Sequence, residues 1–97
     1  HLLSSAASDV YKRQVIERAN DNDLGLCSYV YTNSMEQAHK ASELMETGCV
    51  AVNTAAVAVA EAPFGGIKQT GYGREGGSMA IKDYLNIKYT HLGLKIK

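Results

Sequence analysis

Residues 61–77 read EAPFGGIKQTGYGREGG, and they hold six of the nine glycines of the chain together with its only proline and its only phenylalanine. Glycine is favoured where the backbone needs a positive φ or must pass close to other atoms, and elsewhere it costs conformational entropy. A run this rich in glycine therefore indicates a loop whose backbone path is tightly constrained.

The residues before this loop show the pattern of a strand, a helix and a second strand. Residues 26–32 (LCSYVYT) are rich in aromatic and β-branched side chains, as is typical of a strand. Residues 49–52 (CVAV) form a short apolar run, as expected for a strand that is buried on both faces. Strand, helix and strand at this spacing predict a βαβ unit, and hence an α/β fold with a parallel sheet.

The helix between these strands has clear start and stop signals. Ser34 can cap its N-terminus, with Gln37 at the position of a capping box, and Gly48 is expected to end it. The apolar residues that share one face of this helix are Met35, Ala38, Ala41, Leu44 and Met45. An earlier helix is expected to end over residues 15–20, and NDND followed by Leu24 and Gly25 is expected to be a turn cluster.

Two further elements are predicted after the loop. Residues 78–85 fit a short helix, with Ile81 and Leu85 one turn apart. Residues 86–97 alternate, so that aliphatic side chains face one side and Lys95 and Lys97 face the other. A terminal strand of this kind is expected to lie against another sheet.

Composition limits the classes of function. The chain has 97 residues, 45% of them hydrophobic, and a formal net charge of zero, which argues against nucleic acid or an anionic membrane as a partner. No apolar run approaches the ~20 residues of a membrane helix. Cys27 and Cys49 lie in apolar strands and offer neither a disulfide framework nor metal-ligand spacing, so we expect core thiols in a reducing cytoplasm.

The first 14 residues, HLLSSAASDVYKRQ, do not have the pattern of a secretion signal. The piece DVYKRQ can be back-translated to match the end of a transposon adapter used in sequencing libraries. Residues 1–14 are therefore expected to be a partly non-native leader, and the alternative is a natural helical segment.

The hexapeptide GYGREG, residues 71–76, matches G-x-G-x-x-G only formally. A dinucleotide fingerprint must follow a strand directly, and an acidic residue must occur about 20 positions later. Here a loop precedes the motif and no acidic residue follows Asp83. The motif alone does not predict a nucleotide site.

The longer string PFGGIKQTGYGRE, after a helix–strand unit ending in VAVN, resembles the C-terminal part of the aldehyde dehydrogenase superfamily. RANDNDLGL, APFGGIKQTGYGREGG and DYLNIKYTHLGL are most similar to its succinate-semialdehyde dehydrogenase branch. The resemblance covers residues 15–94. It implies a C-terminal fragment of that α/β fold: part of the catalytic domain over residues 15–85, with a substrate-side loop at 53–77, and an oligomerisation strand at 86–97.

The same resemblance implies the chemistry. Family members oxidise an aldehyde to a carboxylic acid with NAD or NADP: a cysteine thiolate attacks the carbonyl, a hydride leaves to the nicotinamide, and a glutamate-activated water frees the acyl group. The nucleophile, the general base and the cofactor domain would lie upstream of this chain. The fragment alone is thus expected to bind no cofactor and to be inactive, and the whole enzyme to be a cytoplasmic homo-dimer or homo-tetramer acting on an aldehyde such as succinate semialdehyde.

Phe64, by the resemblance, would be an aromatic wall of the aldehyde tunnel, and the alternative is a core aromatic. Ala58 lies six residues earlier, at a position that commonly lines the pocket. In the succinate-semialdehyde branch this position resembles a serine that helps to hold the substrate carboxylate, and alanine has no hydroxyl to offer. Val57 and Val59 are secondary pocket candidates, with structural packing as the alternative.

Glu75 matches a family glutamate that resembles a proton relay between the buried site and bulk water. The alternatives are a salt bridge to Arg74 or a charge at the start of the next helix. Arg74 itself is expected to be structural. The carbonyls of Lys68 and Gly71 match positions that hold a monovalent cation in some betaine-aldehyde members.

A function of a different class also remains open at this point. The chain could be a small stand-alone α/β module that uses its glycine-rich loop to bind a phosphate-bearing ligand or a partner strand.

Overall fold

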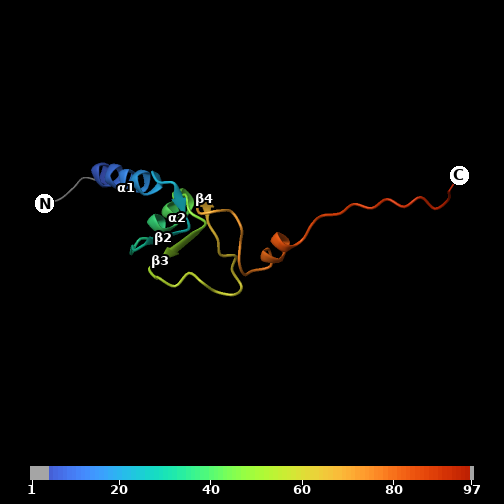
Figure 1. The fold of residues 1–97 in the computed structure, drawn as a ribbon. Coiled ribbons are helices and arrows are strands. Elements are labelled where there is room, and N and C mark those ends of the chain that lie inside the picture. The colour runs from blue at the N-terminus through green and yellow to red at the C-terminus, as the bar shows by residue number, and fades with distance from the viewer. Residues whose placement is uncertain (1–4, 97) are drawn as a thin grey trace.

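The computed structural model describes residues 5–96, with side chains from residue 12 onward; residues 1–4 of the predicted leader and residue 97 of the predicted terminal strand lie outside the described residues. Figure 1 shows helices and short strands in one cluster, from which the red C-terminal segment runs away. The elements are α1 (Ser5–Asn20), β1 (Leu24–Gly25), β2 (Cys27–Val30), α2 (Met35–Leu44), β3 (Cys49–Val52), β4 (Ile67–Lys68) and the 3₁₀ helix η1 (Ala80–Tyr84).

The βαβ unit is confirmed. Strands β2 and β3 pair in parallel, with Cys27 opposite Cys49 and Val30 opposite Val52, and α2 connects them. The predicted Ser34 cap is also confirmed, because the Ser34 hydroxyl accepts a hydrogen bond of 3.2 Å from the backbone N–H of Gln37. The reciprocal half of a capping box does not form, because the Ser34 N–H and the Gln37 side chain both bond the Thr32 hydroxyl instead. A cap of this kind stabilises a helix by about 1 kcal/mol.

The expected apolar face of α2 is only partly buried. Ala38 and Ala41 lie in the core, whereas Met35 and Leu44 are 72% and 51% exposed. The parallel sheet has two strands, so it is too narrow to cover the whole apolar face of the helix. The core of the described residues accordingly contains three alanines and one buried hydroxyl, namely Ala38, Ala41, Ala51 and Ser28.

The prediction that Gly48 ends α2 is wrong. The helix ends at Leu44, and Met45 caps it by donating its N–H to the Ala41 carbonyl at 2.9 Å. Gly48 serves a different purpose, because a Cβ built on it would overlap the carbonyl oxygen of Gly65. Its N–H also donates to the carbonyl of Gly25 at 3.0 Å.

Four glycines from three separate segments make this close approach possible. A Cβ on Gly65 would overlap the carbonyl of Gly73, and one on Gly66 would lie 2.6 Å from the Thr70 methyl. A Cβ on Gly25 would lie 2.8 Å from the side chain of Ile67. We call Gly25, Gly48, Gly65 and Gly66 the glycine crossing. It explains why the loop is rich in glycine: the backbone segments here pack directly on one another.

A second, two-residue pairing joins the loop to the segment between α1 and β2. Strands β1 and β4 are antiparallel, with Leu24 opposite Lys68, and Gln69 donates its N–H to the Asp23 carbonyl at 3.0 Å. The prediction that Leu24 and Gly25 belong to a turn cluster is wrong, since they form β1, and β4 was not predicted either. Two residues carry too little periodicity to identify a strand.

A polar clamp, formed by Asn20, Glu46 and Lys68, holds this junction. The Lys68 ammonium donates to the Asn20 carbonyl at 2.9 Å and the Asn22 carbonyl at 3.2 Å, and it lies 2.8 Å from a Glu46 carboxylate oxygen. The Asn20 carboxamide donates to the Leu44 carbonyl and accepts the N–H of Glu46. The clamp therefore joins the C-terminal ends of α1 and α2 to β4.

The N-terminal helix ends at Asn20, as predicted, and it begins at Ser5 within the predicted leader. The foreign origin of residues 1–14 stays a prediction. Among the described residues, no helix is both long enough and apolar enough to cross a membrane.

The C-terminal part is extended. The predicted helix over residues 78–85 is a shorter 3₁₀ helix with no buried residue, because Ile81 and Leu85 find no surface to pack on and are 63% and 61% exposed. No strand occurs after η1 within the described residues, and Leu94 is fully exposed. A compact domain of this length has a radius of gyration of about 13 Å, whereas the value for this chain is 20.6 Å. The oligomerisation strand at 86–97 stays a prediction.

Candidate active site

The loop that bears the predicted site begins at Asn53, which follows β3. Asn53 has a positive φ of 57°, a conformation that asparagine adopts more readily than most residues. Its carboxamide accepts the N–H of Thr32 and donates to the carbonyl of the same residue, both at 2.9 Å. This side chain therefore ties the start of the loop to β2, and the loop leaves from a fixed point beside the end of that strand.

Phe64 and Glu75 are joined by their backbones. The N–H of each donates to the carbonyl of the other at 2.7 Å, which forms an isolated antiparallel bridge. Side chains directly opposite each other in such a pair project to the same face. Residues eleven positions apart thus become neighbours.

A hollow of about 360 Å³, open to solvent, lies on this face. Four of the five residues singled out from the sequence line it, and Val57, which is half-buried, does not. Two lining residues, Ala60 and Gly76, were not predicted, and no pattern in the sequence identifies them. The lining residues are Ala58, Val59, Ala60, Phe64, Glu75 and Gly76.

Glu75 is the only ionisable residue that lines this hollow. It is exposed, and among the described residues the only ion pair is that of Lys68 with Glu46, so Glu75 does not form the alternative salt bridge to Arg74. The next helix, η1, begins at Ala80, too far along the chain for Glu75 to lie in its first turn. The arrangement is a single carboxylate at the rim of an otherwise apolar hollow.

Arg74 fixes the backbone around Glu75. One guanidinium nitrogen, Nη1, donates to the carbonyls of Gly66, Tyr72 and Gly73 at 2.8, 3.1 and 3.0 Å. The expected structural role of Arg74 is therefore confirmed. Its backbone N–H donates to a carboxylate oxygen of Asp83 at 2.9 Å, a contact that the sequence did not predict.

Lys68 and Gly71 form a tight turn. Both have positive φ, 57° and 104°, and the N–H of Gly71 donates to the Lys68 carbonyl at 3.1 Å. The cation site at these two carbonyls stays a prediction. Elsewhere in the described part of the chain, no three His, Cys, Asp or Glu side chains gather as metal ligands.

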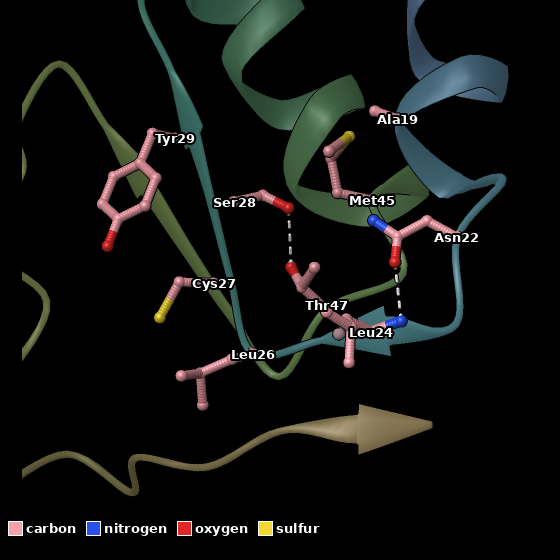
Figure 2. Close-up of a pocket in the computed structure, with 10 residues that line it drawn as sticks. Ala19, Asn22, Leu24, Leu26, Cys27, Ser28, Tyr29, Met45 and Thr47 are labelled. Carbon is pink, nitrogen blue, oxygen red and sulfur yellow. Dashed lines mark hydrogen bonds between the residues drawn. The ribbon is translucent and has the colours of Figure 1, made fainter. Parts of the chain in front are cut away.

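The two cysteines lie apart from this hollow. Figure 2 shows Ser28 on the side of β2 that faces α2 and Cys27 on the opposite side, where it is opposite Cys49 in the register. Partial burial raises the pKa of the Cys27 thiol above its ordinary value, and the nearby Cys49 thiolate charge raises this pKa further. A nucleophilic cysteine needs a lowered pKa, so this environment fits a structural thiol.

A second hollow, of about 280 Å³, opens where α1, β1, β2 and the end of α2 meet (Figure 2). Its hydroxyls are already paired, because those of Ser28 and Thr47 lie 3.0 Å apart. The Asn22 carboxamide oxygen accepts the N–H of Leu24 at 2.6 Å. No acid–base pair faces this hollow, and it offers no catalytic machinery.

The GYGREG motif does not form a nucleotide cradle. It follows the turn at residues 68–71 and pairs with Phe64, whereas a dinucleotide fingerprint runs from a strand into a helix. The motif therefore gives no support for a nucleotide site at residues 71–76.

Comparison with known proteins identifies the family. The model of the Aldehyde dehydrogenase family matches residues 7–90. The chain belongs to the aldehyde dehydrogenase family. The stand-alone binding module is not favoured, because the match covers nearly all of the chain.

Curated relatives of this family member are much longer. A 3-sulfolactaldehyde dehydrogenase of Pseudomonas putida is 51% identical over 80 residues, which are 82% of this chain and 16% of the relative. The NADP-dependent succinate-semialdehyde dehydrogenase of Escherichia coli is 45% identical over 80 residues, or 82% of this chain and 17% of the relative. The chain thus spans about a sixth of the length of these relatives.

Solved structures of the family share the fold. The NAD⁺ complex of an aldehyde dehydrogenase from Bacillus cereus superposes with a TM-score of 0.77 at 38% identity, over 86% of this chain and 17% of that one. The succinate-semialdehyde dehydrogenase from Burkholderia pseudomallei gives 0.72 at 38% identity, over 75% and 15%. The α/β aldehyde dehydrogenase fold predicted from the sequence is confirmed.

Proposed function

We propose that this chain is the C-terminal portion of an NAD(P)-dependent aldehyde dehydrogenase that oxidises a small aldehyde with a distal acidic group. The family match supports the reaction. Relatives named for 3-sulfolactaldehyde, succinate semialdehyde and glutarate semialdehyde support the substrate class, because each of these aldehydes carries a sulfonate or a carboxylate.

The chain's own contribution is one wall of the reaction chamber. Phe64 and the loop residues Ala58 and Val59 offer apolar surface, which excludes water and holds an aldehyde in position for attack. Ala58 has no hydroxyl, so the acidic group of the substrate is held by residues outside this chain. The nucleophilic cysteine, the general base and the nicotinamide cofactor site are likewise supplied by the rest of the polypeptide.

Glu75 is the proposed proton relay. Its carboxylate is exposed at the rim of an apolar hollow, and two hydrogen bonds of 2.7 Å to Phe64 hold its backbone. A relay needs an ionisable group on a path to water that hydrogen bonds hold in place. This placement of one carboxylate beside Phe64 is the observation that carries the proposal.

The test is Glu75→Gln in the full-length enzyme. Glutamine keeps the size and the backbone bonds but cannot carry a proton, so acyl-enzyme hydrolysis is expected to slow by at least about tenfold. Formation of reduced cofactor in the first turnover is expected to stay unchanged. Glu61→Gln, an exposed carboxylate that does not line the hollow, is the matched control. Unchanged hydrolysis in a folded Glu75→Gln enzyme would rule out the relay.

The assembly and location follow from the same proposal. Residues 86–97 add as a strand to the sheet of a second subunit, which gives a homo-dimer or homo-tetramer in the cytoplasm. The exposed aliphatic side chains of Leu92, Leu94 and Ile96 support this, because strand addition would bury them.

A further inference from the structure

We propose that Asp83 is a positioning residue for the proton-transfer step, acting through the backbone of Arg74 and Glu75. The inference rests on the relay role of Glu75 proposed above. Nothing in the sequence pattern indicates Asp83, which lies nine residues after Arg74 on a different element.

The geometry begins with a hydrogen bond. A carboxylate oxygen of Asp83 accepts the backbone N–H of Arg74 at 2.9 Å. This bond holds the peptide group between Gly73 and Arg74. Because Arg74 immediately precedes Glu75, the bond restrains the backbone just before the proposed relay. On the other side, the two bonds between Phe64 and Glu75 fix the relay's own backbone.

The guanidinium of Arg74 completes the arrangement. It donates to the carbonyls of Gly66, Tyr72 and Gly73, so it also fixes the segment before Glu75. The backbone of Glu75 is thereby held by a carboxylate, a guanidinium and a paired strand.

Asp83 also has a special place in the chain. Among the hydrogen bonds between described residues, the one from Arg74 to Asp83 is the only one that joins residues 78–96 to the rest. The helix η1 that carries Asp83 has no buried residue. The contact therefore adds little buried surface, and its effect is to hold residues 74–75 in position.

The experiment compares three substitutions in the full-length enzyme. Asp83→Ala removes the acceptor, and acyl-enzyme hydrolysis is expected to slow by about three- to tenfold. This range corresponds to losing, in the transition state for hydrolysis, part of the free energy of one hydrogen bond to a charged group. Asp83→Asn keeps an acceptor oxygen, so its rate is expected to stay within about twofold of the wild type. Lys82→Ala, an exposed neighbour on η1, is the matched control and is expected to change nothing.

A double-mutant cycle then tests whether Asp83 acts through Glu75. If it does, adding Asp83→Ala to Glu75→Gln slows hydrolysis no further, because the positioned group is already lost. An equal additional loss in that background overturns the proposal, as does a wild-type rate in Asp83→Ala. A parallel fall in first-turnover cofactor reduction also overturns it, since this indicates a general structural defect.

The outcomes distinguish this proposal from the relay role of Glu75 on which it rests. Unchanged hydrolysis in Glu75→Gln rejects the relay and this inference together, whereas a slow Glu75→Gln with a normal Asp83→Ala rejects the positioning role alone. If Asp83→Ala does not fold, Asp83→Leu replaces it, because leucine keeps the volume and removes the acceptor. A folded Asp83→Leu enzyme with a wild-type hydrolysis rate overturns the proposal.

Discussion

Replacing Lys68 by methionine is expected to loosen the junction at which α1, α2 and β4 meet. The Lys68 ammonium bonds the Asn20 and Asn22 carbonyls and the Glu46 carboxylate, and its side chain is only 25% exposed. Methionine fills similar space but donates no hydrogen bond. The change therefore removes all three contacts and leaves the apolar part of the side chain in place.

The magnitude follows from these contacts. A hydrogen bond to a charged group contributes about 1.5–3 kcal/mol. Only the part-buried bond to the Asn20 carbonyl carries this value, because the bond to the Asn22 carbonyl is longer and exposed, so that water competes for it. The ion pair contributes about 0.5 kcal/mol, because the Glu46 side chain is 56% exposed and solvent screens it. The rotamer freedom that methionine regains offsets part of the loss. We expect the substitution to lower the free energy of opening the β1–β4 pairing by about 2 kcal/mol. At about 1.4 kcal/mol per tenfold, the open state becomes about thirtyfold more populated, and amide exchange through it about thirtyfold faster.

The assay is native-state amide hydrogen exchange of the full-length enzyme, followed in peptides that contain Gly48 and Gln69. The N–H of Gln69 is bonded to the Asp23 carbonyl and that of Gly48 to the Gly25 carbonyl, so both report on this junction. Glu46→Gln is the matched control, and it is expected to accelerate exchange by only about twofold. Exchange in Lys68→Met that stays near the wild-type rate, or equal acceleration in both variants, would refute the reasoning.

Three further outcomes are expected in the full-length enzyme. Gly48→Ala should cost more than about 3 kcal/mol, because its methyl group overlaps a backbone carbonyl, and an unchanged melting temperature would contradict this. Cys27→Ala and Cys49→Ala should retain aldehyde oxidation, since neither cysteine lines the hollow beside Phe64 and Glu75, and the raised pKa of the Cys27 thiol disfavours the reactive thiolate; loss of activity in a folded variant would contradict this. Deleting residues 90–97 should yield smaller or unstable species in size-exclusion chromatography, and an unaltered oligomer mass would reject the predicted oligomerisation strand.

The sequence predicted the elements that depend on local signals. The βαβ unit and the Ser34 cap rest on periodicity and on neighbouring residues, and both are confirmed. Gly48 was misassigned because a glycine that permits close backbone approach looks the same in sequence as one that ends a helix. The contacts of Lys68 reach residues 20, 22 and 46, and no local pattern reports on partners so distant in the chain.

The candidate site was identified by resemblance rather than by periodicity. Phe64, Glu75, Ala58 and Val59 come together because an antiparallel bridge folds the loop back on itself. Val57 and Val59 were secondary candidates beside Ala58, and of these two only Val59 lines the hollow. Asp83 could not be found in this way, because its partner is a backbone N–H, which every non-proline residue carries.

The glycine crossing has a practical consequence for redesigning the enzyme. Mutagenesis libraries aimed at new aldehydes should leave Gly25, Gly48, Gly65 and Gly66 invariant, because even one added methyl group at these positions meets neighbouring atoms at or below contact distance. Residues 54–61 are mostly solvent-accessible and leave from the anchored Asn53, so diversity introduced there can reshape the hollow without disturbing the scaffold.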